Sequence, residues 1–204
     1  MMNGHDLILS YSVFCLIMAT TPGPNNMMVL ASGVRFGTRR TLPLILGIAV
    51  GMAVLFGATG SGLGAAFKAL PLLALALRLL SAGFLLWLAW KIATAGPLKQ
   101  DQTDLKMLGF PTGVGFQWIN PKAWAAAMTA ASTYLPADAG AVTIGAGAAI
   151  IALAALIATT IWMTFGVLIS RFLHDPRRAQ AFNMVMAVLL LASTLPILFG
   201  KLAI

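Results

Sequence analysis

Six long apolar runs constrain this chain more than any other feature of its sequence. A transmembrane helix needs about 20 predominantly apolar residues to cross the hydrocarbon core of a bilayer. Only 9% of the 204 residues are charged, whereas a soluble domain carries about 25%. The sequence therefore predicts an all-α membrane protein with six transmembrane helices in a single domain. The runs cover residues 7–33, 42–66, 72–95, 110–135, 141–170 and 180–200.

The longest connection between these runs divides the chain into two halves of three runs each. This connection, residues 96–109, contains Pro97, Gly109 and charges of both signs, as expected of a joint. Because each half holds an odd number of spans, the halves must enter the membrane from opposite sides. We therefore expect two inverted repeats, residues 7–95 and 110–200, an arrangement common among secondary transporters.

Lys and Arg residues gather on one side of the predicted membrane. Nine lie at or after the ends of the first, third and fifth runs, whereas only Lys68 and Lys201 lie in the connections on the other side. Cytoplasmic loops carry such an excess of positive charge, so we expect both termini to face away from the cytoplasm. The excess of Lys and Arg in cytoplasmic loops thus explains the net charge of +8. Because the charge needs no nucleic acid to explain it, we expect no nucleic-acid partner. The nine are Arg35, Arg39, Arg40, Lys91, Lys99, Lys106, Arg171, Arg177 and Arg178.

The first run of each half is interrupted in its interior by proline and asparagine. The clusters read TPGPNN at residues 21–26 and INPK at residues 119–122. Proline lacks an N–H and clashes with the carbonyl four residues earlier, so a helix kinks or stops at each cluster. Asn120 followed by Pro121 has the residue types of an N-cap and a first helical position. Each break would leave a new helix N-terminus inside the membrane, where its N–H groups need polar surroundings.

Lys122 lies about 12 residues from either end of its run, near the middle of the membrane. A lysine at the centre of a membrane helix costs about 2.5–3.5 kcal/mol on insertion scales. The five acidic residues are all Asp and lie at run ends or in connections, where they cannot neutralise it. We expect Lys122 to be unpaired, deprotonated, or paired with a substrate carboxylate. The alternative is a lysine that reaches toward the membrane surface and only orients its helix.

The two clusters together predict one substrate-binding site. Gln117, Asn120, Pro121 and Trp124 fall on one helical face at three- and four-residue spacing, so we expect them to line a cavity. We expect a substrate carboxylate to meet Lys122 and the new helix N-termini, and its ammonium to meet carbonyls freed by the breaks. We expect no catalytic group, metal or cofactor, because the run interiors lack acidic residues and histidines. The candidate substrate-binding residues are Pro22, Gly23, Pro24, Asn25, Asn26, Gln117, Asn120, Pro121, Lys122 and Trp124.

Four motifs, in their order and spacing, resemble the LysE/RhtB family of bacterial amino-acid exporters. The resemblance covers nearly the whole chain, and residues 116–136 are more similar to the cysteine and O-acetylserine branch than to the lysine branch. It implies a bacterial plasma-membrane protein that exports amino acids or small derivatives by exchange with protons. The motifs are TPGPNN at 21–26, LGIAVGMAV at 46–54, LLSAGFLLWLAWKIA at 79–93 and FQWINPKAW at 116–124.

Met52 departs from the pattern of this family, because many members carry an acidic residue at that position. The usual proton carrier is therefore missing, and coupling would run through Lys122, through ionisable groups of the substrate, or not at all. The leading hypothesis is an exporter of neutral or zwitterionic molecules such as cysteine, O-acetylserine or homoserine.

Two other functions stay open at this point. A passive facilitator would need no coupling, and a membrane assembly subunit would pair Lys122 with an acid of a partner chain. The expected partners are a small amino-acid substrate and the lipid bilayer. Glycines four residues apart, at Gly47 and Gly51 and at Gly109 and Gly113, allow close helix contacts and permit a homodimer without requiring one.

Overall fold

The computed structural model describes residues 4–63, 71–94, 108–173 and 175–199. Within these residues every regular element is a helix, which confirms the all-α prediction. The predicted linker 96–109 lies almost entirely outside the described residues. The elements are α1 (Gly4–Thr20), α2 (Pro24–Ala58), η1 (Thr59–Leu63), α4 (Pro71–Ala93), α5 (Phe110–Phe116), α6 (Pro121–Tyr134), α7 (Ala141–Ile169), η2 (Ser170–Phe172) and α8 (Pro176–Phe199).

Three of the predicted runs each correspond to one helix, namely α4, α7 and α8. By length and composition, two described stretches could cross a membrane: Pro24–Leu63, with mean hydropathy 2.2, and Ala141–Phe172, with mean hydropathy 2.4. His5–Thr20 and Ala82–Ala93 are shorter apolar helices. The predicted number of six spans stays a prediction.

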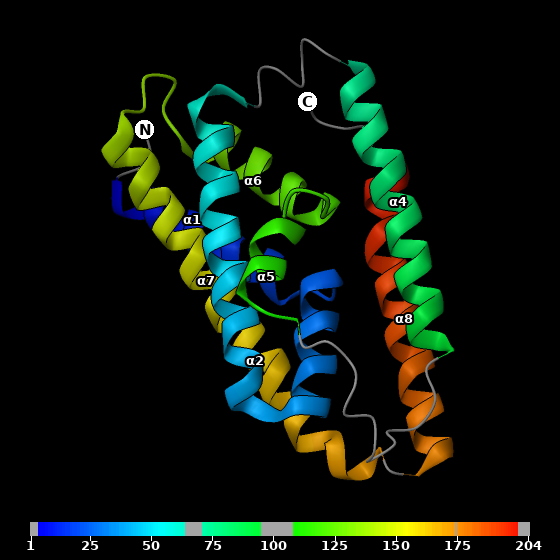
Figure 1. Ribbon diagram of the computed structural model, residues 1–204. Coiled ribbons are helices and arrows are strands. Elements are labelled where there is room, and N and C mark those ends of the chain that lie inside the picture. The colour runs from blue at the N-terminus through cyan, green and yellow to red at the C-terminus, as the bar shows by residue number, and fades with distance from the viewer. Residues whose placement is uncertain (1–3, 64–70, 95–107, 174, 200–204) are drawn as a thin grey trace.

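α2 turns back on itself at Gly37. This residue has φ 72° and ψ −178°, in a region that glycine adopts without the steric cost of a side chain. The hydroxyls of Ser32 and Thr41, on either side of the turn, lie 2.9 Å apart, and the chain reverses at the lower end of Figure 1. α2 therefore consists of two segments, residues 24–36 and 38–58. The predicted connection between the first two runs is shorter than expected, because helix continues on both sides of Gly37.

Both proline clusters break the helix, as predicted. α1 ends at Thr20 and α2 begins at Pro24, whereas α5 ends at Phe116 and α6 begins at Pro121. Both prolines lie in the first turn of the new helix, where the missing N–H leaves no helical hydrogen bond unmade. The first predicted run of each half is thus a pair of helical segments that meet inside the molecule.

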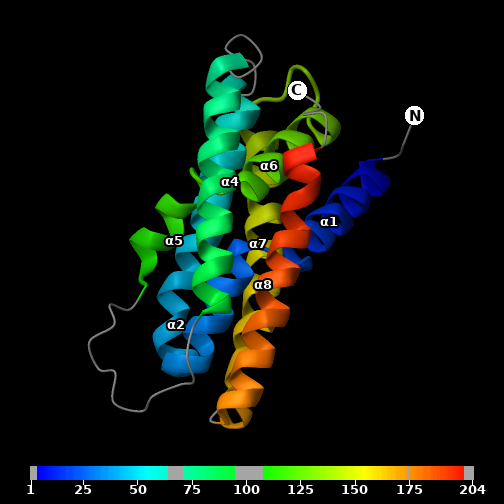
Figure 2. The ribbon, with the colours of Figure 1, turned by 90° about the vertical axis from the view of Figure 1, so that its right-hand side faces the viewer.

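The helices form two groups around two apolar cores. α1, α2, α6 and α7 share the larger core, in which Leu44, Ile48 and Phe56 are fully buried. α4 and α8 pack on each other and on the start of α2 through Leu85, Leu190 and neighbours. Figures 1 and 2 show α4 and α8 as an antiparallel pair beside the other helices. The two proline breaks lie beside the larger core, whose residues Cys15, Ile48 and Ile151 also line the site.

Close backbone contacts hold α5 against α2. A Cβ atom on Gly47 would lie 2.2 Å from the carbonyl oxygen of Phe110, and a Cβ on Gly51 would lie 2.7 Å from Cγ of Gln117. A Cβ on Gly113 would lie 2.6 Å from the carbonyl oxygen of Leu44. These glycines serve packing within the chain, and the homodimer stays a prediction.

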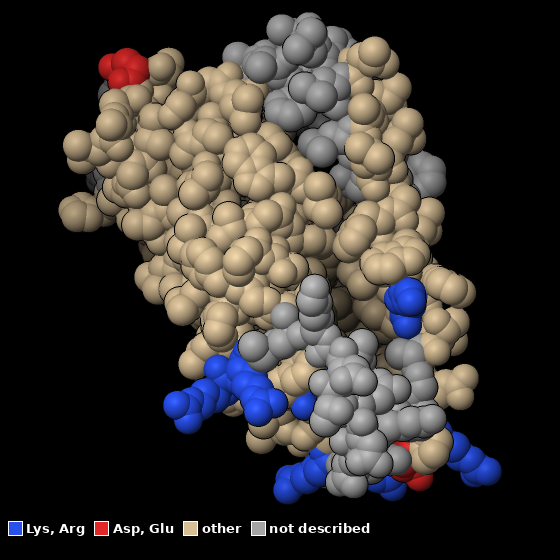
Figure 3. Space-filling model, viewed as in Figure 1, with Lys and Arg blue, Asp and Glu red and all other residues tan. Residues whose placement is uncertain are grey.

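Positive charge gathers at one end of the molecule, the lower end in Figure 3. Above it, the visible face is almost free of charge. Large apolar side chains are exposed on the described helices, among them Leu79 and Leu80 of α4. An extensive apolar surface of this kind fits contact with lipid rather than water. The charged end holds the Gly37 turn, the end of α4 and the connection from α7 to α8, with Arg35, Arg39, Arg40, Lys91, Arg171, Arg177 and Arg178. Lys68, Lys99, Lys106 and Lys201 lie outside the described residues.

Candidate functional site

The last backbone carbonyls of α1 have no helical N–H to bind, because the helix stops at the break. Side chains from other segments donate hydrogen bonds to these carbonyls instead. The side-chain nitrogen of Asn26 donates to the carbonyls of Ala19 and Thr21, each at 2.9 Å. Trp162 of α7 donates its indole N–H to the carbonyl of Thr20 at 3.1 Å. The first break is therefore a defined polar structure, built by residues that are distant in the sequence.

Lys122 reaches across from the second break to the first. Its ammonium donates to the carbonyl oxygens of Thr21 and Pro22, at 3.1 Å in the case of Pro22. The C-terminal end of a helix carries partial negative charge, so a cation is stabilised at the end of α1. The expectation of an unpaired lysine, or of one paired only by a substrate, is wrong here. That expectation considered acidic side chains and left out the carbonyls that the other break sets free.

The second break has the N-cap that the sequence predicted. The side-chain oxygen of Asn120 accepts a hydrogen bond from the backbone N–H of Lys122 at 3.1 Å, and Pro121 occupies the first helical turn. Gly23 is the N-cap of α2, with an extended backbone and no side chain to cap the helix. A Cβ at Gly23 would lie 2.8 Å from Cδ of Lys122, so this glycine makes room for the lysine.

Asn25 and Gln117 join the two breaks a second time. Their side-chain amides form two reciprocal hydrogen bonds, from Asn25 to Gln117 at 2.9 Å and from Gln117 to Asn25 at 3.1 Å. Gln117 is fully buried and also donates to the carbonyl of Gly113 at 2.9 Å. The pair fixes the start of α2 against the end of α5.

This amide pair predicts a measurable coupling. Replacing either Asn25 or Gln117 with leucine leaves the other amide partly unsatisfied, and each change is expected to lower the free energy of unfolding by about 1–3 kcal/mol. Replacing both removes both polar groups, so the double variant should lose less than the sum of the single losses. Unfolding of the purified variants in detergent measures the cycle. Additive losses would mean that the pair contributes no coupling.

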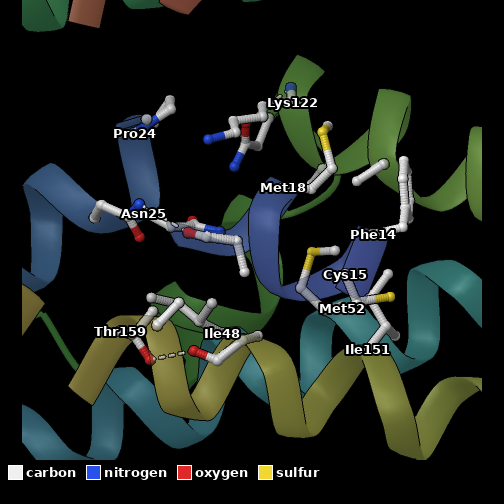
Figure 4. Close-up of a pocket in the computed structure, with 18 residues that line it drawn as sticks. Phe14, Cys15, Met18, Pro24, Asn25, Ile48, Met52, Lys122, Ile151 and Thr159 are labelled. Carbon is white, nitrogen blue, oxygen red and sulfur yellow. Dashed lines mark hydrogen bonds between the residues drawn. The ribbon is translucent and has the colours of Figure 1, made fainter. Parts of the chain in front are cut away.

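A pocket with an empty volume of about 540 Å³ lies against both breaks. One part of its wall is polar and comes from Asn25, Asn26, Asn120 and Lys122, with Gly23 and Pro24 beside them. The other part is apolar and includes the sulfur-bearing side chains of Cys15, Met18 and Met52. In Figure 4, Lys122 lies next to Met18 near the top of the view, Asn25 lies at the left, and Cys15 and Met52 lie lower, at the right.

Six of the ten predicted site residues line this pocket, and four do not. Pro22 contributes its carbonyl to Lys122, and Pro121 is buried at the start of α6. Gln117 does not line the pocket but binds the side chain of Asn25, which does. The indole of Trp124 donates to the carbonyl of Trp118 at 2.9 Å. The expected shared face of a continuous helix is wrong, because the helix is broken between Gln117 and Asn120. The six are Gly23, Pro24, Asn25, Asn26, Asn120 and Lys122.

Sequence reasoning missed the apolar wall of the pocket. Phe14 and Met18 come from α1, and Ile151 and Ala155 come from α7. These residues give no polar signal within long apolar helices. The available signal was Met52, whose departure from the family pattern falls on a pocket-lining position.

Comparison with known proteins identifies the family of this chain. Cysteine/O-acetylserine efflux proteins from Salmonella paratyphi A and Salmonella typhi are each 32% identical to this chain, over 90% of it and 93% of theirs. The protein of the same name from Escherichia coli K12 is 30% identical, with the same coverage. No solved structure gives a significant match. Residues 16–199 match the family described as LysE type translocator, and with both proline breaks inside that match, this chain belongs to the LysE family of membrane translocators.

Proposed function

We propose that this chain exports zwitterionic amino acids or their small derivatives from the bacterial cytoplasm across the plasma membrane. The carrying observation is Lys122, which brings a cation from one helix break to the carbonyls of the other and lines a pocket that both breaks help to form. Among the described residues that line the pocket, none is acidic. A ligand with its own carboxylate would complement this arrangement.

Each group of an amino acid has a complementary partner in the pocket or directly beside it. The carboxylate pairs with Lys122 and approaches the first turn of α2, whose N-cap Gly23 provides no competing side chain. The ammonium binds carbonyls at the end of α1. The side chain extends toward Cys15, Met18 and Met52, a wall that favours uncharged groups. The names of the relatives support cysteine or O-acetylserine as substrates, and homoserine has similar size and charge.

Transport requires the two halves to move about this pocket. We propose that residues 7–95 and 110–200 form inverted repeats, each beginning with a broken helix. The second segment of α2 packs on α7, and α4 packs on α8, so equivalent members of the two halves contact each other. Rocking of one half against the other would expose the pocket to each side in turn.

Orientation gives a direct test of this arrangement. The positively charged end should face the cytoplasm. In a Cys15→Ala background, a cysteine placed at exposed Arg177 should react with an impermeant thiol reagent only after cells are opened. A cysteine at exposed Asp138, at the other end of α7, should react in intact cells. The reverse pattern would place both termini in the cytoplasm.

Efflux from proteoliposomes tests the function itself. Vesicles are preloaded with labelled cysteine, O-acetylserine, homoserine, serine or lysine, with and without a pH gradient. We expect selective efflux of the neutral substrates, weak efflux of lysine, and a rate that the gradient changes. Failure to move any of these amino acids would refute the proposal.

A passive facilitator is the second candidate, because Met52 occupies a pocket position where many relatives of the family carry an acid. It predicts selective efflux that the pH gradient leaves unchanged. The assembly-subunit hypothesis was based on a lysine that lacks a partner within its own chain. Lys122 binds backbone carbonyls of its own chain, so this reason for the hypothesis no longer applies.

A further inference from the structure

The ammonium of Lys122 occupies the place that suits the ammonium of a substrate. Its partners, the carbonyls of Thr21 and Pro22, lie at the C-terminal end of α1. The other carbonyls of this break, those of Ala19 and Thr20, bind neutral N–H groups of Asn26 and Trp162. The carbonyl of Thr21 binds both Asn26 and the Lys122 ammonium, and the carbonyl of Pro22 binds the ammonium, so these two carbonyls are the part of this break that holds a cation.

We infer that Lys122 acts as an internal occupant of the substrate ammonium subsite, which makes the chain select zwitterions over simple amines. This inference rests on the proposed function. A zwitterion can replace the lysine at the carbonyls, because its carboxylate then accompanies the displaced Lys122 ammonium. An amine without a carboxylate brings a second positive charge into the pocket and supplies no anion for Lys122.

The surroundings of Lys122 support this exchange. Its side chain runs against Gly23, where a Cβ would lie 2.8 Å from Cδ and 3.1 Å from Nζ. Lys122 and Gly23 both line the pocket, so the pocket adjoins the place where the lysine binds the carbonyls. No acidic residue lines this described pocket, so two ammonium groups within it would repel each other without compensation.

The selectivity depends on the charge of Lys122 rather than on its size. Lys122→Met removes the charge and frees the carbonyls, whereas Lys122→Arg keeps a cation on a long side chain. The methionine variant should therefore accept amines that the native chain excludes. The arginine variant should still exclude them.

Binding of matched ligand pairs tests this inference. The probes are L-serine with ethanolamine and L-homoserine with 3-amino-1-propanol, titrated calorimetrically into purified protein in lipid nanodiscs. The native chain should bind each amino acid at least tenfold more tightly than its amine. Lys122→Met should reverse this preference, and Lys122→Arg should retain it. Lys91→Met, which changes an exposed lysine of α4 in the same way, should match the native chain.

The outcomes separate this inference from the proposed function. If the native chain binds the amino acids but Lys122→Met gains no affinity for the amines, the inference is wrong and the exporter function stands. Equal native affinity for an amino acid and its amine, or a gain of amine binding in Lys122→Arg, would also overturn it. If the native chain binds neither amino acid while Lys122→Met binds the amines, the subsite is supported and the exporter function needs another substrate.

Discussion

Replacing Gly113 with valine is expected to prevent this protein from reaching a stable folded state. A Cβ at Gly113 would lie 2.6 Å from the carbonyl oxygen of Leu44, 2.7 Å from the nitrogen of Ile48 and 2.8 Å from the carbonyl carbon of Gly47. All three atoms belong to the backbone of α2, which cannot move aside as a flexible side chain can. The loss should exceed the ~1–3 kcal/mol of ordinary overpacking, because α5 would separate from α2.

Gly115 provides a matched control on the same helix. It is exposed, and a Cβ there would meet no atom within 4 Å. Gly115→Val should therefore elute from size exclusion in detergent, and melt, close to the native protein. Gly113→Val should aggregate or melt far lower. Equal behaviour of the two variants would show that α5 does not contact α2 as described.

Export should depend strongly on Lys122. Lys122→Met leaves a substrate carboxylate without its charged partner, and hydrogen bonds to charged groups contribute about 1.5–3 kcal/mol. Efflux at low substrate concentration should therefore fall about tenfold to a hundredfold. The fold should persist, because the carbonyl of Thr21 keeps its bond from Asn26. The measurement is the initial rate of efflux from preloaded proteoliposomes.

Lys91→Met is the control for this change, since Lys91 is an exposed residue near the end of α4. It should export at the native rate. If Lys122→Met also exports at the native rate and melts normally, Lys122 does not bind the carboxylate.

Local sequence rules predicted the framework of the site. The prolines predicted where the first run of each half is broken, because the missing N–H and the ring of proline exclude a continuous helix. Asn120 before Pro121 predicted an N-cap, and its side chain makes that bond. The distribution of Lys and Arg predicted one positively charged end, which the described residues show (Figure 3).

The contacts across the site could not be read from the sequence. Lys122 binds the carbonyls of Thr21 and Pro22, which lie about 100 positions earlier in the chain. Every residue has a backbone carbonyl, so the sequence does not indicate which of them will bind a lysine. The spacing of Gln117 and Trp124 predicts one shared helix face, but the break at Asn120 removes that periodicity. The apolar wall from α1 and α7 depends on tertiary packing, which a uniformly apolar helix does not reveal.

The central claim is that the two helix breaks together form one amino-acid site, and an experimental structure with L-homoserine bound tests it most directly. We expect the ligand in the pocket of Figure 4, with its carboxylate within hydrogen-bond distance of Nζ of Lys122. Its ammonium should lie at the carbonyls of Thr21 and Pro22, and Lys122 should have left them. A ligand bound elsewhere, with Lys122 still on those carbonyls, would contradict the account.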